Sequence, residues 1–292
     1  MLTAAAMLAP DGRCKTLDAA ADGYVRGEAV TALALSAREE LAAPGGASVL
    51  AVVAGTAVNQ DGRSSSLTAP HGPSQQAVVV AATAAAGLTP SELGAVEMHG
   101  TGTALGDPIE VGALAAIVRR PSGGLPTELA AAKSSYGHAE TAAGAVGMLR
   151  AAQRLQGHAR FAVLHLCALN PYVDSAMEGA GAGAFAAARQ AAPGLLPAAG
   201  GMHAGVSAFA FQGTNAHAVL GSTAAAVEPG TALAAAAAAW QRCRFWYQPA
   251  PHHLLHRAAV EPGAGSAAFD VALGRPALAF LWEHQVSGGA CR

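Results

Sequence analysis

A histidine placed between a strand and a helix is the feature that most constrains this chain. Residues 96–110 read VEMHGTGTALGDPIE. A short apolar run leads to His99 and a Gly/Thr turn follows, so the pattern predicts a helix with Asp107 as N-cap, Pro108 at the first helical position and Glu110 closing a capping box. An imidazole beside backbone N–H groups and a helix N-terminus suits acid–base or oxyanion chemistry. We therefore place the candidate site at His99.

Two other interpretations of this turn remain open. Gly100, Gly102 and Gly106 follow a strand and open a helix, as the glycines of a dinucleotide-binding loop do. About twenty residues farther on, such a loop needs a strand ending in an acidic residue, whereas residues 119–122 read RRPS. The third interpretation is a structural turn whose histidine is satisfied in the core.

Two later segments carry further motifs, and the first of them repeats the plan of this turn. Residues 133–140 read KSSYGHAE and follow an apolar segment, which predicts a second strand, histidine-bearing turn and helix. Residues 205–220 read GVSAFAFQGTNAHAVL, and their alternating runs on either side of a Gln-Gly-Thr turn predict a β-hairpin. The other predicted elements are a strand over 48–58 and helices over 74–86 and 141–155.

Together the three segments resemble the β-ketoacyl synthases of polyketide and fatty acid synthesis. The family pattern is HGTGT with GDPIE, then K-S-N-I-G-H-x-E, then G-F-G-G-T-N-A-H, and this chain has all three in that order at family-like separations. The resemblance implies an α/β, thiolase-like layered αβαβα fold, with the C-terminal half and part of the N-terminal half in residues 1–221. Two departures are Tyr136 in place of an aliphatic residue and Gln212 in place of Gly or Ser, where the turn could require positive φ.

The resemblance also implies a reaction, the decarboxylative Claisen condensation of an acyl thioester with a malonyl thioester. It assigns His99 and His138 as the two hydrogen-bond donors to the enolate. Lys133 and Glu140 become a charged pair around the second histidine that sets its orientation and its protonation. A solvated ion pair is the plainer interpretation of Lys133 and Glu140.

Six further residues carry over as contacts for the substrate. The backbone around Phe211 and Gly213 corresponds to half of an oxyanion hole. Hydroxyl or amide groups are candidates to contact a phosphopantetheine arm or loop backbone, and these belong to Thr101, Thr103, Thr214 and Asn215. Phe211 as a core residue and Asn215 as a turn cap are the alternatives.

The family nucleophile is absent from these motifs. It lies in a T-A-C-S-S-S-type elbow before a GRCK loop, and Cys14 corresponds to the ordinary cysteine of that loop, which is not nucleophilic. We therefore expect the chain alone to be unable to condense, which leaves its status as an enzyme open. The alternatives are a non-catalytic synthase-like scaffold or partner subunit, an incomplete gene product, and a nucleotide-binding oxidoreductase.

The last part of the chain has a different character. Residues 222–239 are an Ala-rich linker. Residues 240–292 contain WQRCRFWY and then HHLL, which is similar to the start of a hot-dog dehydratase domain. His284 fits the first half of that domain's H-x-x-x-G-x-x-x-x-P motif. An unstructured tail is the alternative.

The amino-acid composition limits the classes of partner that the chain is expected to bind. Charged residues make up 12%, aromatic residues 5%, and the net charge is -2, which argues against nucleic acid. No long apolar run has side chains large enough for a membrane span. The four cysteines show no CxxC spacing, which favours a reducing, cytoplasmic compartment. We expect no metal and no cofactor, substrates carried on the phosphopantetheine of an acyl carrier protein, further synthase domains as partners, and, from the family, a homodimer.

Overall fold

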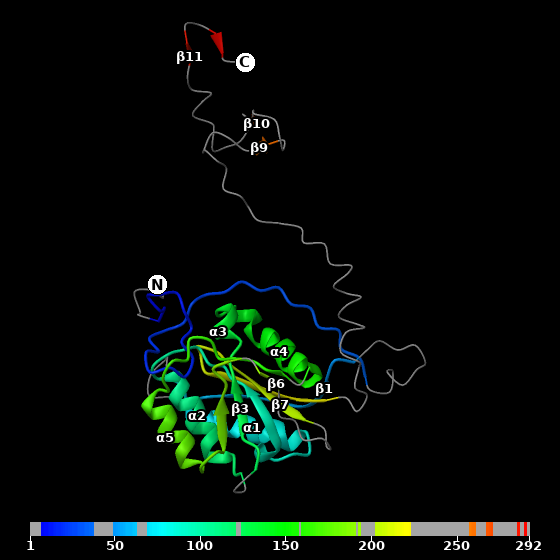
Figure 1. Cartoon of the computed structure of the whole chain (residues 1–292). Helices are drawn as coiled ribbons and strands as arrows, with labels where there is room; N and C mark the ends of the chain where they lie inside the picture. Colours follow the sequence, from blue (N-terminus) through cyan, green and yellow to red (C-terminus); the bar gives the residue numbers. More distant parts are fainter. Residues whose placement is uncertain are drawn as a thin grey trace. The chain divides into compact units, whose positions relative to one another are not determined.

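A six-stranded mixed sheet lies between the helices described among residues 7–222 (Figure 1). The computed structural model describes residues 7–37, 49–62, 69–120, 124–157, 159–190, 192–193 and 202–222, together with four short strands farther along. The strand order is β1-β8-β7-β2-β3-β5. These strands are β1 (Val52–Gln60), β2 (Leu93–Glu97), β3 (Thr127–Ala130), β5 (Phe185–Ala187), β7 (His203–Phe209) and β8 (Thr214–Gly221).

Helices cover both faces of this sheet. Figure 1 shows α1, α2 and α5 on one face and α3 and α4 on the other. Their bounds are α1 (Gly72–Ala85), α2 (Gly106–Ile117), α3 (Lys133–Tyr136), α4 (Ala143–Gly157) and α5 (Pro171–Gly179), with 3-10 turns at Pro90–Glu92 and Glu140–Ala142. Strands β4 (Ala159–Arg160) and β6 (Ala192–Pro193) pair antiparallel and form a separate two-stranded ribbon. Helices on both faces of a largely parallel sheet agree with the predicted layered α/β class.

Alternate residues of one strand supply the two cores. Val96 on β2 packs in the core with Val111 and Leu114 of α2. Its neighbour Ala95 packs in the other core, with Leu155 of α4. Successive side chains of a strand point to opposite faces, so a fully buried β2 must be apolar at both positions.

Strand direction brings the three sequence motifs to one edge of the sheet. Strand β2 pairs in parallel with β3 and with β7, so the carboxyl ends of all three strands point the same way. The first histidine turn follows β2, the second follows β3, and the turn at residues 210–213 follows β7. Sites in open α/β sheets form at this edge.

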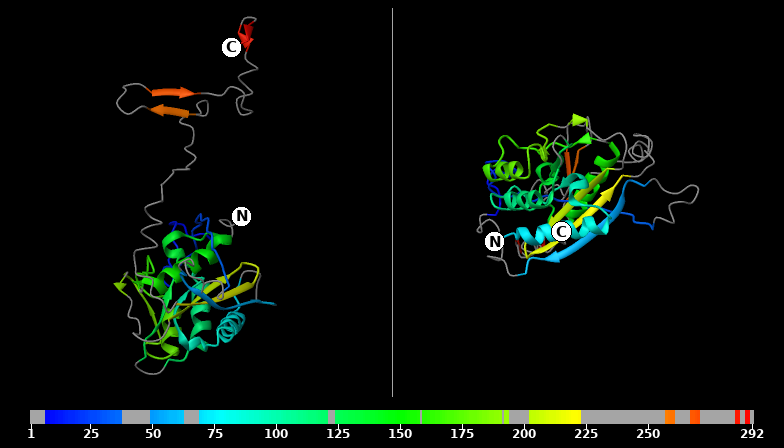
Figure 2. Two further views of the ribbon diagram at one scale, coloured as in Figure 1. Left: turned by 90° about the vertical axis from the view of Figure 1, so that its right-hand side faces the viewer. Right: turned by 90° about the horizontal axis from the view of Figure 1, so that it is seen from below.

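The predicted hairpin is confirmed. Strands β7 and β8 pair antiparallel from His203 opposite Gly221 to Phe209 opposite Asn215. Strand β1 pairs antiparallel with β8 and lies alongside the hairpin (Figure 2). The strand predicted over 48–58 exists, but it runs from Val52 to Gln60. The predicted plan at the second histidine is wrong in one respect, because the short helix α3 intervenes between β3 and the turn.

The chain divides into two units, residues 1–235 and 236–292. In the second unit β9 (Arg257–Val260) pairs antiparallel with β10 (Ala267–Asp270), and β11 (Gln285–Val286) with β12 (Gly289–Ala290). The predicted linker at 222–239 lies almost wholly outside the described residues, and so does His284. The dehydratase interpretation of 240–292 therefore stays a prediction.

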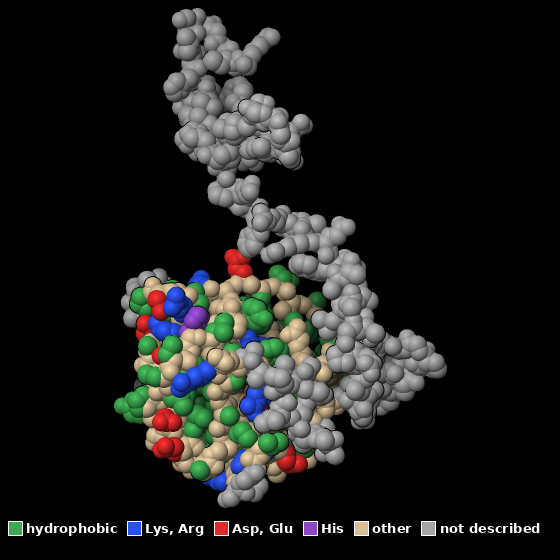
Figure 3. All heavy atoms as spheres, viewed as in Figure 1, with side chains coloured by type: hydrophobic (Ala, Val, Ile, Leu, Met, Phe, Trp, Pro, Cys, Tyr) green, Lys and Arg blue, Asp and Glu red, His purple; other side chains and the backbone are tan. Residues whose placement is uncertain are grey.

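The described part of the face drawn in Figure 3 shows little concentration of charge. On the face in Figure 3, Lys and Arg side chains are scattered among apolar and uncharged ones. That face therefore offers no continuous basic surface. Among the described residues, no helix is both long and apolar enough to cross a lipid bilayer.

At Gly55 the backbone of β1 approaches the end of α1 closely, and this contact gives a test of the packing. A Cβ built on Gly55 would lie 2.6 Å from the backbone N of Ala86 and would also collide with the carbonyl of Ala82. We expect Gly55→Ala to lower the free energy of unfolding by about 1–3 kcal/mol, because backbone atoms must move to accept the methyl group. Urea unfolding followed by circular dichroism measures this change.

Gly112 on α2 is the matched control, since a Cβ there meets no atom within 4 Å. Gly112→Ala should raise the free energy of unfolding by up to about 1 kcal/mol, through helix propensity. A Gly55→Ala variant as stable as the starting protein would contradict the packing of α1 on β1.

Candidate active site

Two buried carboxylates shape the histidine turn, which we define as residues 99–106. Glu110 accepts hydrogen bonds from the backbone N–H groups of His99 and Gly100, at 2.8 and 2.9 Å. Asp107 accepts from Leu17 and Gly102, at 2.8 and 3.1 Å. Gly100 and Gly102 have φ of 44° and 78°, where L side chains are strained. These hydrogen bonds therefore connect the turn to the helix that follows it, and connect that helix to the segment around Leu17.

The predicted capping box at this helix is wrong. Helix α2 begins at Gly106, with Leu105 as N-cap, so Asp107 lies inside the first turn. The hydroxyl of Thr103 accepts a hydrogen bond from the N–H of Gly106 at 3.1 Å. Because Thr103 satisfies this donor, the carboxylates of Asp107 and Glu110 are available for the backbone of the turn.

The same hydrogen bonds rule out the dinucleotide-loop interpretation. A pyrophosphate would need free backbone N–H groups in the glycine turn. Those of His99, Gly100 and Gly102 donate to Glu110 or Asp107. The two carboxyl groups would also repel a phosphate when ionised.

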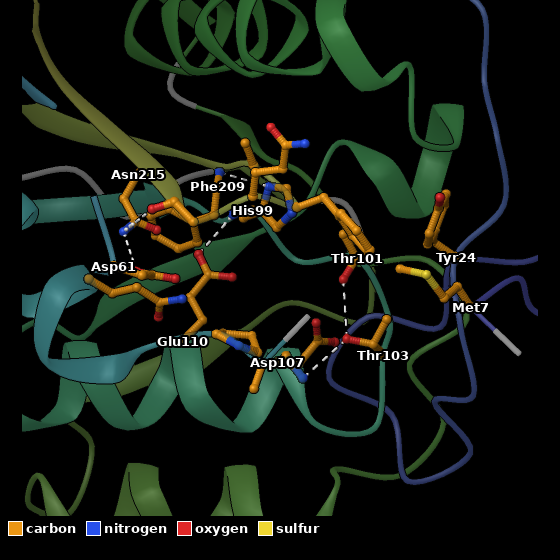
Figure 4. Close-up of a pocket in the computed structure, with 18 of the residues that line it drawn as sticks. Met7, Tyr24, Asp61, His99, Thr101, Thr103, Asp107, Glu110, Phe209 and Asn215 are labelled. Atoms are coloured by element: carbon orange, nitrogen blue, oxygen red, sulfur yellow. Dashed lines mark hydrogen bonds between the residues drawn. The ribbon is translucent and has the colours of Figure 1, made fainter. Parts of the chain in front are cut away.

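The structure brings the two predicted histidines together. The ring centroids of His99 and His138 are 5.5 Å apart, and the ring planes are nearly perpendicular at 86°. Both rings line one cavity of about 230 Å³, which Figure 4 shows together with Glu110, Asp107 and Thr101. The arrangement can therefore present two imidazoles to one bound group.

A backbone N–H fixes the tautomer of each ring. Nδ1 of His99 accepts from the N–H of Phe209 at 3.2 Å, and Nδ1 of His138 accepts from the N–H of Glu140 at 3.0 Å. A neutral imidazole whose Nδ1 is an acceptor carries its proton on Nε2. Each ring is thus left with one N–H donor for the cavity.

The surroundings keep both rings neutral. Burial, together with the charge of Lys133, lowers the pKa of His99 well below its ordinary value of 6.5. The same two causes lower the pKa of His138 to about 4. At neutral pH both rings are therefore uncharged donors, available where negative charge develops.

Residues near the N-terminus position the second histidine. The N–H of His138 donates to the carbonyl of Val25 at 2.7 Å, and its carbonyl accepts from Gly27 at 2.8 Å. The ring of Tyr24 packs edge-on against the imidazole, with centroids 5.2 Å apart. Glu140 takes a left-handed φ of 49°, which is uncommon for a non-glycine residue and brings its N–H to the ring.

The predicted charged pair of Lys133 and Glu140 is wrong. The exposed carboxylate of Glu140 pairs with Arg26 at 3.3 Å. Lys133 is buried, and burial lowers its pKa, while the negative charges of Glu110 and Glu97 oppose that shift. Lys133 therefore acts on the imidazoles through its field, and Glu140 acts through its backbone.

The other predicted contact residues divide into two groups. Thr101, Thr103, Phe211, Gly213 and Asn215 line the cavity. Thr214 does not, because its exposed hydroxyl donates to Oε1 of Gln60 at 2.9 Å. The left-handed position of this turn is Gly213, with φ of 86°, so the concern about positive φ at Gln212 was misplaced. No contact among the described residues tests an oxyanion role for the N–H of Phe211, which stays a prediction.

Several residues of the site were missed from the sequence. The N–H of Phe209 orients His99, and the carboxylate of Asp61 accepts from Nδ2 of Asn215 at 2.6 Å. Gln75 of α1 also lines the cavity. The turn signature that includes Asp61 was visible in the sequence, but its pairing with Asn215 spans 154 residues. Nothing local distinguishes Gln75.

The geometry defines a thiolase-like α/β fold whose site presents two neutral imidazole donors. The profile described as "Beta-ketoacyl synthase, N-terminal domain" matches residues 1–41, and that described as "Beta-ketoacyl synthase, C-terminal domain" matches residues 50–166. This chain belongs to the β-ketoacyl synthase family. Its sequence is that of a ketosynthase of the kind found in type I polyketide synthases.

Similar proteins of known type support this family assignment. The chain is 46% identical over 219 residues to mycoketide-CoA synthase of Mycobacterium tuberculosis, covering 73% of this chain and 5% of that protein. With erythronolide synthase EryA2 of Saccharopolyspora erythraea it shares 42% over 216 residues, covering 73% and 6%. With polyketide synthase GfsE of Streptomyces halstedii it shares 45% over 216 residues, covering 73% and 5%. The chain thus spans only a small part of the length of these relatives.

Solved structures give the same fold. A ketosynthase domain of oxazolomycin synthesis, OzmH KS7 of Streptomyces albus JA3453, matches with a TM-score of 0.66 and 33% identity over 76% of this chain and 38% of that one. The ketosynthase from module 6 of the bacillaene synthase of Bacillus subtilis 168 matches with a TM-score of 0.69 and 29% identity, over 76% and 39%.

The tautomers and protonation states of the two imidazoles can be observed directly. Near neutral pH, long-range 15N–1H spectra should show both rings protonated at Nε2 and bare at Nδ1, because a backbone N–H donates to each Nδ1. His138 should gain its second proton only as the pH falls through about 4. A His138→Gln variant assigns its signals. A ring protonated at Nδ1 near neutral pH would contradict the geometry.

Lys133 offers a separate electrostatic test. Its charge lowers the pKa of both rings, so Lys133→Met should raise the pKa of His138 above about 4 while leaving it below 6.5, since burial is the larger cause. Lys133→Arg is the control, because it keeps the positive charge. NMR titration of the His138 ring measures the shift, and circular dichroism checks the fold. Equal pKa values in the two variants would contradict a role through charge.

Proposed function

We propose that this chain binds a malonyl thioester and stabilises the enolate that forms when the thioester loses carbon dioxide. This is the carbanion-forming half of the decarboxylative Claisen condensation catalysed by 3-oxoacyl-acyl carrier protein synthases. The observation that supports it most is the pair of Nε2–H donors on rings 5.5 Å apart at one cavity. Membership of the polyketide ketosynthase family supports it independently.

The electron pair can be followed through the proposed decarboxylation. The bond between the malonyl carboxylate and the α-carbon breaks, and its electron pair passes into the enolate as carbon dioxide leaves. Negative charge then grows on the thioester oxygen, where His99 and His138 each donate one hydrogen bond. A preorganised donor of this kind contributes about 3 kcal/mol to a transition state.

Substrate delivery follows from the proposed family function. The thioester is carried on the phosphopantetheine of an acyl carrier protein, so the chain needs no cofactor of its own. The hydroxyl of Thr101, which is 3.3 Å from that of Thr103, is a candidate contact for the arm. Other domains of a multidomain synthase, and a second copy of the synthase in a homodimer, complete the proposed set of partners.

Condensation also needs an acyl group on a thiol. The enolate carbon attacks the acyl carbonyl carbon, the bond between that carbon and sulfur breaks, and the thiolate that carried the acyl group leaves. Cys14 does not suit this role, because its buried thiol accepts from the N–H of Val25 at 3.2 Å and burial raises its pKa. We propose that decarboxylation can occur on this chain and that the complete condensation needs an acyl thioester on a different thiol.

Carbon dioxide release tests the proposal. The full chain, incubated with malonyl acyl carrier protein labelled in the free carboxyl group, should release labelled carbon dioxide. His99→Ala and His138→Ala should each reduce that rate by about 10²-fold or more, through the loss of one donor. Trapping of the released gas measures the rate.

His71→Ala is a matched control, because the His71 ring bonds Ser74 and does not line the cavity. It should leave the rate unchanged. If the chain binds the malonyl carrier protein but releases no carbon dioxide, the scaffold or partner-subunit function replaces the enzymatic one. If carbon dioxide is released equally by the His99→Ala variant, the donors have no role in the chemistry.

A further inference from the structure

Gln75 lines the cavity, and the oxygen of its buried side-chain amide has no hydrogen-bond partner among the described residues. It lies in the first turn of α1, where its N–H donates to the carbonyl of His71 at 3.1 Å. The residue is only 3% exposed. No donor in the described part of the chain reaches its Oε1. A buried carbonyl oxygen without a donor is unfavourable, so a function is a natural reason for it.

Several other polar side chains that line the cavity do not donate to Gln75. Both carboxylate oxygens of Glu110 accept from the backbone of the histidine turn, and the side-chain N–H groups of Asn215 donate to Asp61, Asn59 and the carbonyl of Gly213. Asp61 and Asp107 also line the cavity and present carboxyl groups. The cavity therefore contains several acceptors besides Gln75, and its imidazole donors, on His99 and His138, are the ones assigned above to the thioester oxygen.

A bound molecule that brings its own donor would fit this surface. The arm of a phosphopantetheine thioester contains amide N–H groups, and an acyl chain reduced at the β-carbon contains a hydroxyl. Either donor could pair with Oε1 of Gln75 while the thioester carbonyl lies near the two imidazoles. Rejecting a substrate that lacks the donor is a strong form of selectivity, because the site is then left with a buried, unpaired acceptor.

We propose that Gln75 is a specificity-determining residue whose Oε1 accepts a hydrogen bond from an N–H or O–H group of the bound thioester. The proposal rests on the thioester function proposed above. It adds a chemical requirement for a donor on the substrate.

Small thioesters can test the proposal on the full chain. Butyryl-N-acetylcysteamine supplies the amide N–H, and its ester analogue replaces that N–H by oxygen with nearly the same shape. The 3-hydroxybutyryl thioester of the ester analogue restores a donor on the acyl side. NMR titration gives each Kd, and comparing the three ligands identifies the source of the donor.

The expected result is a preference that depends on Gln75. The full chain should bind one donor-bearing ligand about tenfold more tightly than the donor-free ester, the size of one hydrogen bond. Gln75→Met keeps the length of the side chain and removes the acceptor, so this preference should vanish. Gln76→Met is the matched control, since Gln76 is partly exposed and does not line the cavity.

The melting temperature of the ligand-free chain provides a second test of Gln75. Here the substitution is expected to be neutral or stabilising, although it weakens the ligand preference. Removing a buried unpaired oxygen should leave Tm unchanged or higher in Gln75→Met. A marked fall in Tm would show that the amide serves the fold through a bridging water, and would overturn the proposal. A preference that persists in Gln75→Met would overturn it as well. Failure of every thioester to bind the full chain would overturn the proposed function and this inference together.

Discussion

The structure of the site depends on two carboxylates that bind backbone N–H groups rather than a ligand. Asp107 and Glu110 lie one turn apart on α2 and connect the end of β2 to a segment 90 residues earlier in the chain. Burial raises their pKa values to about 6 and about 7. Since burying these groups is unfavourable, the backbone hydrogen bonds must offset much of that cost. The position of His99 follows directly from this arrangement.

Lys133 complements these acidic groups. Its buried ammonium lies in the field of Glu110 and Glu97, which favours its charged form against burial. The same charge disfavours imidazolium at His99 and His138. One cation thus offsets the buried carboxylates and keeps two neighbouring rings neutral. These groups therefore form one electrostatic unit, and changes within it should not be additive.

Local patterns predicted the elements better than the contacts between them. The β7–β8 hairpin was predictable because strand alternation and turn residues are local signals. The convergence of His99 and His138 followed from family motifs. The capping box was wrong because a local pattern cannot show that Asp107 accepts a hydrogen bond from Leu17, 90 residues earlier in the chain. The left-handed backbone of Glu140 and the unpaired amide of Gln75 depend on tertiary packing and leave no periodic signal.

The hydrogen bonds at Nδ1 have a consequence for which reactions can begin here. Phe209 and Glu140 occupy the lone pair of each imidazole, and the other nitrogen already holds a hydrogen. Neither ring therefore offers the cavity a basic site, and a carbanion cannot be made by deprotonating an unactivated acetyl group at these histidines. Breaking a carbon–carboxylate bond creates the same nucleophile with no base required. For the function proposed above, the geometry at the far side of each ring therefore favours carboxylated extender units over simple acetyl thioesters.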